Sequence, residues 1–340
     1  MTLALTAAAS TWVVSPPPPA GDFFFGFLGR GMRAPLTGKA ASIWQTPHSC
    51  TPGSVPPKAG SNDMQVTISG LFVYPVKSAH AIERTRVPLT ATGLEWDRQW
   101  MIVKAPGLFL TQRSHPQLAR IVPQVRAGAL VLEFTGLPPL AVPLSASGAR
   151  TPVRVWQDAC MGLDEGSAAA DWVSRAVGEP VRLMRAAPDM GRLSDPRFAG
   201  STPAPISFPD GFPILVCNEA SLADLNRRMA EPIPMERFRP NIVVQGLPPW
   251  AEDRVDTLTI GPVTLRLVKP CTRCTIPSID QHTGQPAADP APALRQFRFS
   301  RELRGVMFGE NAVIVRGLGE TLAQGATVEA SCEAQTAAAL

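Results

Sequence analysis

The sequence has 340 residues, of which 45% are hydrophobic, and its formal net charge is +4. This length allows one large domain or two ordinary ones, with ample apolar material for a core. The mild charge does not indicate a nucleic-acid partner, and no apolar run reaches the roughly 18 to 20 residues of a membrane span. Six irregularly spaced cysteines do not form a secreted disulfide framework, so a reducing compartment is favoured.

The first 63 residues differ in composition from the rest of the chain. They are rich in Ala, Ser, Pro and Gly, hold a run of four prolines at 16–19 and show no sustained periodicity. This composition is typical of a disordered extension. Its basic, acid-poor character also fits a transit-type segment. We therefore expect a disordered extension over 1–63 and a cytoplasmic protein, or an organellar one if the extension is a transit segment.

The part from 64 to 180 is predicted to consist of short strands and one helix. The 36 prolines of the whole chain favour strands and turns over long helices. The helix is expected over 167–177, where apolar residues recur on one face. The predicted strands cover 65–74, 81–88, 95–103, 129–134, 140–144 and 153–156. Strands at this spacing are typical of a small barrel or sandwich.

The part from 181 to 333 continues mainly as strands, before a tail at 334–340. Ser221 is expected to N-cap a second helix, with Asp224 three residues on as in a capping box. Residues 189–204 and 285–300 are expected to be loops. The predicted strands cover 181–184, 212–217, 241–245, a hairpin over 258–268, 311–316 and 326–330. The fold class is therefore mainly β with a few helices (α+β).

One stretch, KPCTRCTIPSIDQHTG over 269–284, concentrates reactive groups. Cys271 and Cys274 form a C-x-x-C pair that follows a predicted strand. Structural zinc would need a second such pair or spaced histidines, which the sequence lacks. A thioredoxin-like dithiol would open a helix, whereas Pro277 follows closely here. The two remaining interpretations are buried, inert cysteines and a single thiolate that binds a soft transition metal with open positions.

Basic side chains also stand at predicted loops and strand ends. Each alone is more often solvated or ion-paired than a ligand. Together with a thiolate, they would suit an anionic cofactor with a phosphate tail. No G-x-G-x-x-G or Walker-type loop is present, so those kinds of nucleotide binding are not indicated. The residues are Lys77 (next to Ser78), Arg98 in WDRQW, Arg239 in FRPN and Arg273 inside the cysteine pair.

Six motifs, in order over residues 64–330, resemble those of MOSC-domain proteins that carry the MOSC amino-terminal β-barrel. This family includes the mitochondrial amidoxime-reducing components and bacterial relatives. The motifs are YPVKS, WDRQW, NEASLADLN, FRPNIVV, KPCTRCTIPSIDQHTG and FGEN.

The resemblance implies a MOSC β-barrel domain over 181–333, packed on an amino-terminal β-barrel-like subdomain over 64–180. It implies a molybdenum cofactor (molybdenum–molybdopterin, a phosphate-bearing pterin dithiolate) in the cleft between them. Cys274 would be the metal ligand and catalytic residue, with Cys271 as its neighbour. Asp280 fits the family motif without a firm role and is otherwise expected to cap a turn. The implied cofactor contacts are Lys77, Ser78, Arg98, Arg239, Asn241, Thr272 and Arg273.

The implied activity is reduction of N-hydroxylated compounds such as amidoximes, hydroxylamines and N-hydroxylated bases. Only Cys332 follows the site, so the iron–sulfur module of some relatives is not expected. Electrons would come from a separate ferredoxin, flavoprotein or cytochrome-type protein. Two alternatives stay open: a non-catalytic molybdenum-cofactor carrier or sulfur-transfer protein, and a metal-free binding module with structural cysteines.

Overall fold

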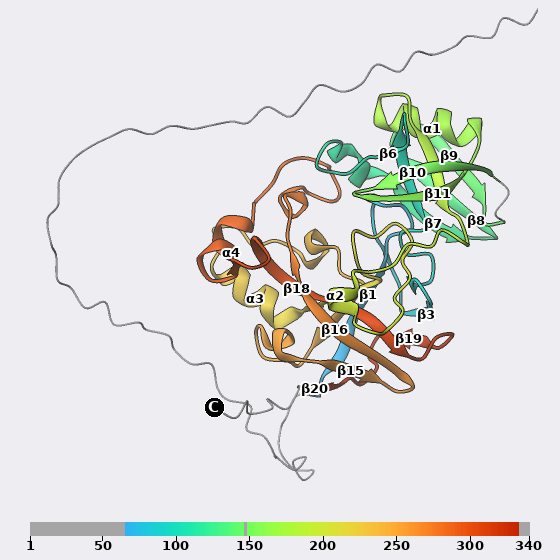
Figure 1. Ribbon diagram of the computed structural model, residues 1–340. Coiled ribbons are helices and arrows are strands. Elements are labelled where there is room, and N and C mark those ends of the chain that lie inside the picture. Colours follow the sequence, from blue (N-terminus) through green and yellow to red (C-terminus); the bar gives the residue numbers. More distant parts are fainter. Residues whose placement is uncertain (1–64, 146–147, 333–340) are drawn as a thin grey trace, which may run out of the picture. The chain divides into compact units, whose positions relative to one another are not determined.

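The computed structural model describes residues 65–145 and 148–332 (Figure 1). The predictions for the extension over 1–63 and the tail over 334–340 fall outside these residues. The described residues form twenty strands and four α-helices, which confirms a mainly β fold with a few helices. None of the helices in these two ranges is long and apolar enough to cross a membrane.

Five strands close a barrel in the order β10-β11-β12-β5-β6. Helix α1 and the three-stranded sheet β7-β8-β9 pack against it through a shared apolar core that includes Trp100, Leu132 and Trp172. The expected helix over 167–177 is confirmed, and it ends where Gly178 adopts a left-handed conformation. The elements are β5 (Trp100–Lys104), β6 (Leu108–Phe109), β7 (Val122–Arg126), β8 (Ala129–Phe134), β9 (Leu137–Pro143), β10 (Ala149–Val155), β11 (Asp158–Asp164), α1 (Ser167–Val177) and β12 (Arg182–Ala186).

A nine-stranded sheet has the order β2-β1-β14-β13-β18-β16-β15-β20, with β17 paired to β18 off this path. Its two longest strands, β16 and β18, lie side by side and antiparallel (Figure 1). The predicted hairpin over 258–268 is β15 with the first part of β16. The strands are β1 (Thr67–Val73), β2 (Ile82–Glu83), β13 (Ile214–Asn218), β14 (Ile242–Gln245), β15 (Thr257–Ile260), β16 (Val263–Thr272), β17 (Phe299–Ser300), β18 (Gly305–Arg316) and β20 (Glu329–Ser331).

The remaining elements are short, and two helices pack on the nine-stranded sheet. Helices α3 and α4 share an apolar core with Cys217 of β13 and Phe308 of β18. A small sheet has the order β19-β3-β4. The elements are β3 (Arg86–Thr90), β4 (Gly93–Leu94), β19 (Thr321–Ala323), α2 (Pro196–Ala199), α3 (Glu219–Arg227), α4 (Ala291–Phe297) and 3-10 turns at Pro116–Arg120, Met235–Phe238, Ala251–Arg254 and Ile276–Ser278.

Strand pairing crosses the predicted domain boundary at residue 180 in both directions. Strand β1 pairs with β14, and β12 pairs with β5 to complete the barrel. The boundaries themselves stay a prediction. The pairing of β1 with β14 matters for the site because it holds the loop after β1 beside the loop before β14.

Three local predictions are wrong. Asn218, not Ser221, caps α3: its side chain accepts a hydrogen bond from the Ala220 N–H at 3.1 Å. Ser221 lies inside the helix, where its hydroxyl accepts from the Trp250 N–H at 2.8 Å. The expected loop at 285–300 contains α4 and β17, and the one at 189–204 contains α2. Both helices have proline in the first turn, where its missing N–H does no harm.

Candidate functional site

One cavity is lined by every residue that the sequence singled out for binding. Its volume is about 140 Å³. The predicted residues in its lining are Lys77, Ser78, Arg98, Arg239, Asn241, Thr272, Arg273 and Cys274. The structure therefore brings these eight residues together, and their roles as ligands stay a prediction.

The cavity has two walls that come from different parts of the chain. The basic wall comprises Lys77, Arg98, Arg239 and Asn241, which lie on the loops after β1, before β5 and before β14. The cysteine wall comprises residues 271–274 at the end of β16. Pairing of β1 with β14 joins the first set of loops, and the Phe72 N–H donates to the Asn241 carbonyl at 2.9 Å.

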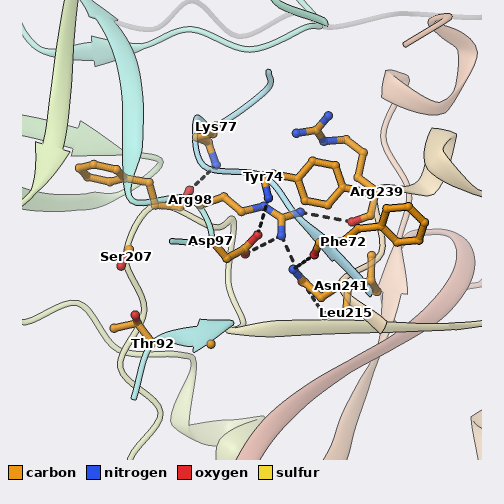
Figure 2. Close-up of polar contacts among 12 residues, drawn as sticks. Phe72, Tyr74, Lys77, Thr92, Asp97, Arg98, Ser207, Leu215, Arg239 and Asn241 are labelled. Atoms are coloured by element: carbon orange, nitrogen blue, oxygen red, sulfur yellow. Dashed lines mark hydrogen bonds and ion pairs between the residues drawn. The ribbon is translucent and has the colours of Figure 1, made fainter. Parts of the chain in front are cut away.

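Arg98 is the centre of a buried hydrogen-bond network in the basic wall (Figure 2). Its Nη1 donates to Asp97 Oδ2 at 2.6 Å and to Asn241 Oδ1 at 3.1 Å. Its Nη2 donates to the Arg239 carbonyl at 3.2 Å. Asp97 is 2% exposed and also accepts from the Tyr74 N–H at 2.9 Å. Burial raises the pKa of Asp97, and the Arg98 guanidinium opposes this.

Arg239 lies on the other side of the same network. Its guanidinium and that of Arg98 each lie 4.2 Å from the centre of the Tyr74 ring (Figure 2). Its Nη1 donates to the Ala79 carbonyl at 2.8 Å and to Gln281 Oε1 at 3.1 Å. Burial lowers the pKa of Arg239 to about 10, so the side chain stays cationic at neutral pH.

Three residues of these loops have an unusual backbone conformation, with positive φ. Ser78, Arg98 and Arg239 have φ values of 67°, 47° and 55°, in the left-handed region that costs most non-glycine residues energy. In all three, the carbonyl or side chain lies in the hydrogen-bond network that surrounds the cavity. The surrounding contacts therefore hold a backbone geometry that the residues alone would not favour.

Lys77 is paired inside the cavity with a residue that the sequence did not reveal. Its Nζ donates to Asp210 Oδ1 at 2.5 Å and to the Phe208 carbonyl at 2.8 Å. Burial lowers the pKa of Lys77, and the Asp210 carboxylate opposes this. The indole Nε1 of Trp156 also donates to Asp210 at 3.1 Å. Asp210 follows no motif and lies 133 residues from Lys77, so no local signal could have paired them.

The cysteine wall is more open. Cys274 is exposed, Cys271 is half-buried and Cys217 is buried. Arg273 points at the first cysteine of the pair: its Nη1 donates to Cys271 Sγ at 2.9 Å and its Nη2 to the Phe238 carbonyl at 2.6 Å. Burial opposes the charge on Arg273, but the neighbouring Cys271, Cys217 and Cys274 sulfurs outweigh it and raise its pKa. The Cys274 thiol is thus left facing the cavity.

The donors present fit an anionic ligand that carries a soft metal. Among the described residues, Arg239 Nη2 and Arg273 Nε are buried without a hydrogen-bond acceptor, which is costly for a guanidinium unless a ligand supplies the acceptor. Residues 65–145 and 148–332 hold no group of three or more His, Cys, Asp or Glu side chains suited to a metal ion. A metal at Cys274 would therefore be one whose other ligands come with the bound group.

Two neighbours complete the surroundings. Asp280 caps a turn, as expected: its Oδ1 accepts from the His282 and Thr283 N–H groups at 3.1 and 2.8 Å. Gln281, which sequence reasoning missed, is buried and exchanges two side-chain hydrogen bonds with Gln112. This pair links the turn after the cysteines to the barrel side of the cavity. Thr111, Arg113 and Phe212 also line the cavity and belong to no motif, and Asn311, the last residue of the FGEN motif, lines it too.

Two family models match the chain. The MOSC N-terminal beta barrel domain matches residues 65–180, and the MOSC domain matches residues 203–329.

Curated relatives fall into two groups. Mitochondrial amidoxime reducing component 2 of Bos taurus is 33% identical over 242 residues, covering 68% of this chain and 72% of the relative. Mitochondrial amidoxime-reducing component 1 of Homo sapiens is 33% identical over 243 residues, with the same coverage of 68% and 72%. Molybdenum cofactor sulfurase of Danio rerio is 32% identical over 272 residues, which cover 73% of this chain. The match spans only 32% of that sulfurase's length.

Proposed function

The chain belongs to the family of MOSC-domain proteins with a MOSC amino-terminal β-barrel, and on this premise we propose that it is a molybdenum-cofactor-dependent reductase of N-hydroxylated compounds. The observation that carries the proposal is the cavity itself. It combines an exposed thiol at Cys274 with buried cations, two of which have donors without acceptors.

Each wall has its own part in this function. The Cys274 thiolate would bind the metal, since soft thiolates suit sulfur-rich transition-metal sites. Lys77, Arg98 and Arg239 would bind the phosphate and pterin oxygens, because charge-assisted hydrogen bonds to anions are strong. Ser78, Asn241, Thr272 and Arg273 would complete these contacts.

The bound cofactor would supply the two-electron chemistry that converts N–OH into N–H. The protein would hold the cofactor, fix the orientation of its metal through Cys274 and admit a small substrate through the open mouth. The electrons would come from a separate electron-transfer protein of the ferredoxin, flavoprotein or cytochrome type. Arg113 and Asp210 also line the cavity and would be charged groups available to a bound substrate.

A second function is favoured by one observation. The chain is as similar to molybdenum cofactor sulfurases as to amidoxime-reducing components, at 32% and 33% identity. A cofactor carrier or sulfur-transfer protein would use the same cavity without turnover. Arg273 beside Cys271 would then stabilise a reactive sulfur next to the bound cofactor.

Turnover by the full chain, produced in cells that make the cofactor, separates the two functions. Benzamidoxime, phenylhydroxylamine and an N-hydroxylated cytosine would be supplied with dithionite-reduced methyl viologen as donor, and the N–H products measured. We expect turnover in the wild type and in Cys332→Ser, and background rates in Cys274→Ser. A molybdenum-loaded wild type without turnover on any of the three substrates would contradict the reductase and favour the carrier.

A further inference from the structure

Residues 295–304, here named the arginine hairpin, form a basic and aromatic surface next to the cysteine wall. The segment reads RQFRFSRELR, with four arginines against one glutamate. It runs from the end of α4 through β17 to the turn before β18. Phe297 and Phe299 are 36% and 45% exposed, and Arg295, Arg301 and Arg304 are exposed.

Three of these arginines have charges that the described residues do not balance. Arg298 forms an ion pair with Asp253, so its charge is already matched. Arg295, Arg301 and Arg304 form no ion pair within residues 65–145 and 148–332. Arg295 instead lies 5.7 Å from the centre of the Phe299 ring.

Strand pairing holds the arginine hairpin against the start of the cysteine pair. Strand β17 pairs with β18, opposing Ser300 and Gly305. On its other side, β18 pairs with the end of β16, where Thr272 opposes Met307. The Arg273 N–H donates to the Val306 carbonyl at 2.8 Å, and a Cβ added at Gly305 would lie 3.4 Å from Thr272 Cβ. The hairpin ends at Arg304, next to Gly305 on the strand that neighbours Thr272. Because neighbouring strands lie about 4.8 Å apart, β17 lies about two strand spacings from β16.

We propose that the arginine hairpin is the docking surface for an acidic electron-transfer protein, an inference that rests on the proposed function. Unbalanced exposed arginines attract an acidic partner and speed its association. Arginine and aromatic side chains are also the residues most enriched at binding hot spots. The position beside residues 272–274 would bring the partner's redox group close to the cavity. Reduction of one N–OH group to N–H with release of water takes up two electrons and two protons, and the docked partner would deliver the electrons.

The test measures binding and turnover separately. The probe is plant-type [2Fe–2S] ferredoxin, an acidic one-electron carrier, and its affinity for the immobilised full chain is measured at low ionic strength. A variant with Arg295→Glu, Arg301→Glu and Arg304→Glu is compared with the wild type. The matched control carries the same charge change at exposed arginines on β3, α1 and the far end of β18: Arg86→Glu, Arg175→Glu and Arg316→Glu.

We expect the hairpin variant to bind the ferredoxin at least about tenfold more weakly than the wild type. The control variant should be weakened much less, because its three arginines lie on β3, α1 and the far end of β18, outside the arginine hairpin. Viologen-driven turnover should be unchanged in both variants, since a small donor needs no docking surface. Ferredoxin-driven turnover should fall only in the hairpin variant.

Other results would overturn the inference. Equal weakening in both triple variants would mean that net charge, not this surface, attracts the probe. A wild type that does not bind the ferredoxin at low ionic strength, or a hairpin variant that binds it as well as the wild type, would also contradict the proposal. Failure of the proposed function has a different signature: no viologen-driven turnover in any form, with hairpin-dependent binding intact.

Discussion

The basic wall of the cavity is largely buried and, apart from Arg239 Nη2, hydrogen-bonded within the chain, whereas the cysteine wall is more exposed. Lys77, Arg239 and Asn241 are 6%, 8% and 2% exposed, and each is bonded to the chain. Cys274, by contrast, is exposed. The charges of the basic wall are thus part of what holds the fold, because a buried charge is tolerated only when it is paired and hydrogen-bonded. The exposed Cys274 thiol contributes little to the stability of the fold and is accessible to a ligand in the cavity.

Because of this difference, substitutions in the basic wall should mainly lower stability, and substitutions in the cysteine wall should mainly impair metal binding. A change that unpairs the basic wall should unfold the protein before it reveals anything about binding. A change at Cys274 should leave the fold intact and remove the metal. Behind the cysteine wall, a buried carboxyl on β18 should make stability depend on pH.

The largest expected effect is that of Asp97→Ala. Asp97 balances the buried charge of Arg98 and accepts the Tyr74 N–H, so its removal leaves a cation and a donor unpaired. We expect a loss of about 3–5 kcal/mol in unfolding free energy, measured by urea denaturation. Asp97→Asn, which retains an acceptor for Tyr74, should lose less. Equal stability of Asp97→Ala and the wild type would show that the network does not support the fold.

The next effect is that of Glu310→Gln, and it depends on pH. Glu310 lies on β18 opposite Pro270 and is 3% exposed. Burial raises its pKa to about 9, and the Asp253 and Glu252 carboxylates add to this, whereas an unfolded glutamate has a pKa of about 4.3. Below about pH 4.3 Glu310 is protonated in both the folded and the unfolded chain, so its ionisation costs the wild type no unfolding free energy there. As the pH rises towards 9 the unfolded state ionises first, and the wild type loses stability.

Glutamine is neutral at every pH and nearly the same size as protonated glutamate. Between pH 5 and 8.5 the unfolding free energy of the Glu310→Gln variant should therefore rise relative to that of the wild type, by on the order of a few kcal/mol. Urea denaturation at several pH values measures the difference. Glu302→Gln, at an exposed glutamate, is the control and should show no such trend. A Glu310→Gln difference that stays constant with pH would refute the assignment of a protonated buried carboxyl.

The smallest expected effect on stability is that of Cys274→Ser. The side chain is exposed, and surface substitutions usually change unfolding free energy by less than about 0.5 kcal/mol. Thermal unfolding of the protein without cofactor should show a midpoint close to that of the wild type. A large drop would mean that Cys274 is structural, as in the metal-free binding module.

Sequence reasoning succeeded where the signal was local or carried by a motif. The apolar face over 167–177 predicted α1, and the hairpin expected over 258–268 is formed by β15 and the first part of β16. The eight residues taken from the motifs all line one cavity, because the segments after β1 and at the end of β16 meet the loops before β5 and β14 there.

It failed where a distant residue decides the outcome. Ser221 has the right spacing for an N-cap, but its hydroxyl is used by Trp250, 29 residues away. Asp210 reaches Lys77 only through the fold. Helix α4 was hidden by Pro290 and Pro292, which read as loop residues although a first helical turn tolerates proline. For Ser221 and Lys77 a long-range contact supplied the missing information, whereas α4 was missed on a local reading of its prolines.

The most direct test of the account is the molybdenum content of three proteins made in cofactor-producing cells. The wild type and Cys271→Ser should both retain near-stoichiometric molybdenum, since Cys271 is held by Arg273 and is expected to be a neighbour of the metal. Cys274→Ser should lose it while unfolding at the same temperature as the cofactor-free wild type. Molybdenum that survives in Cys274→Ser, or a wild type without molybdenum under conditions that load a known molybdoenzyme, would contradict the account.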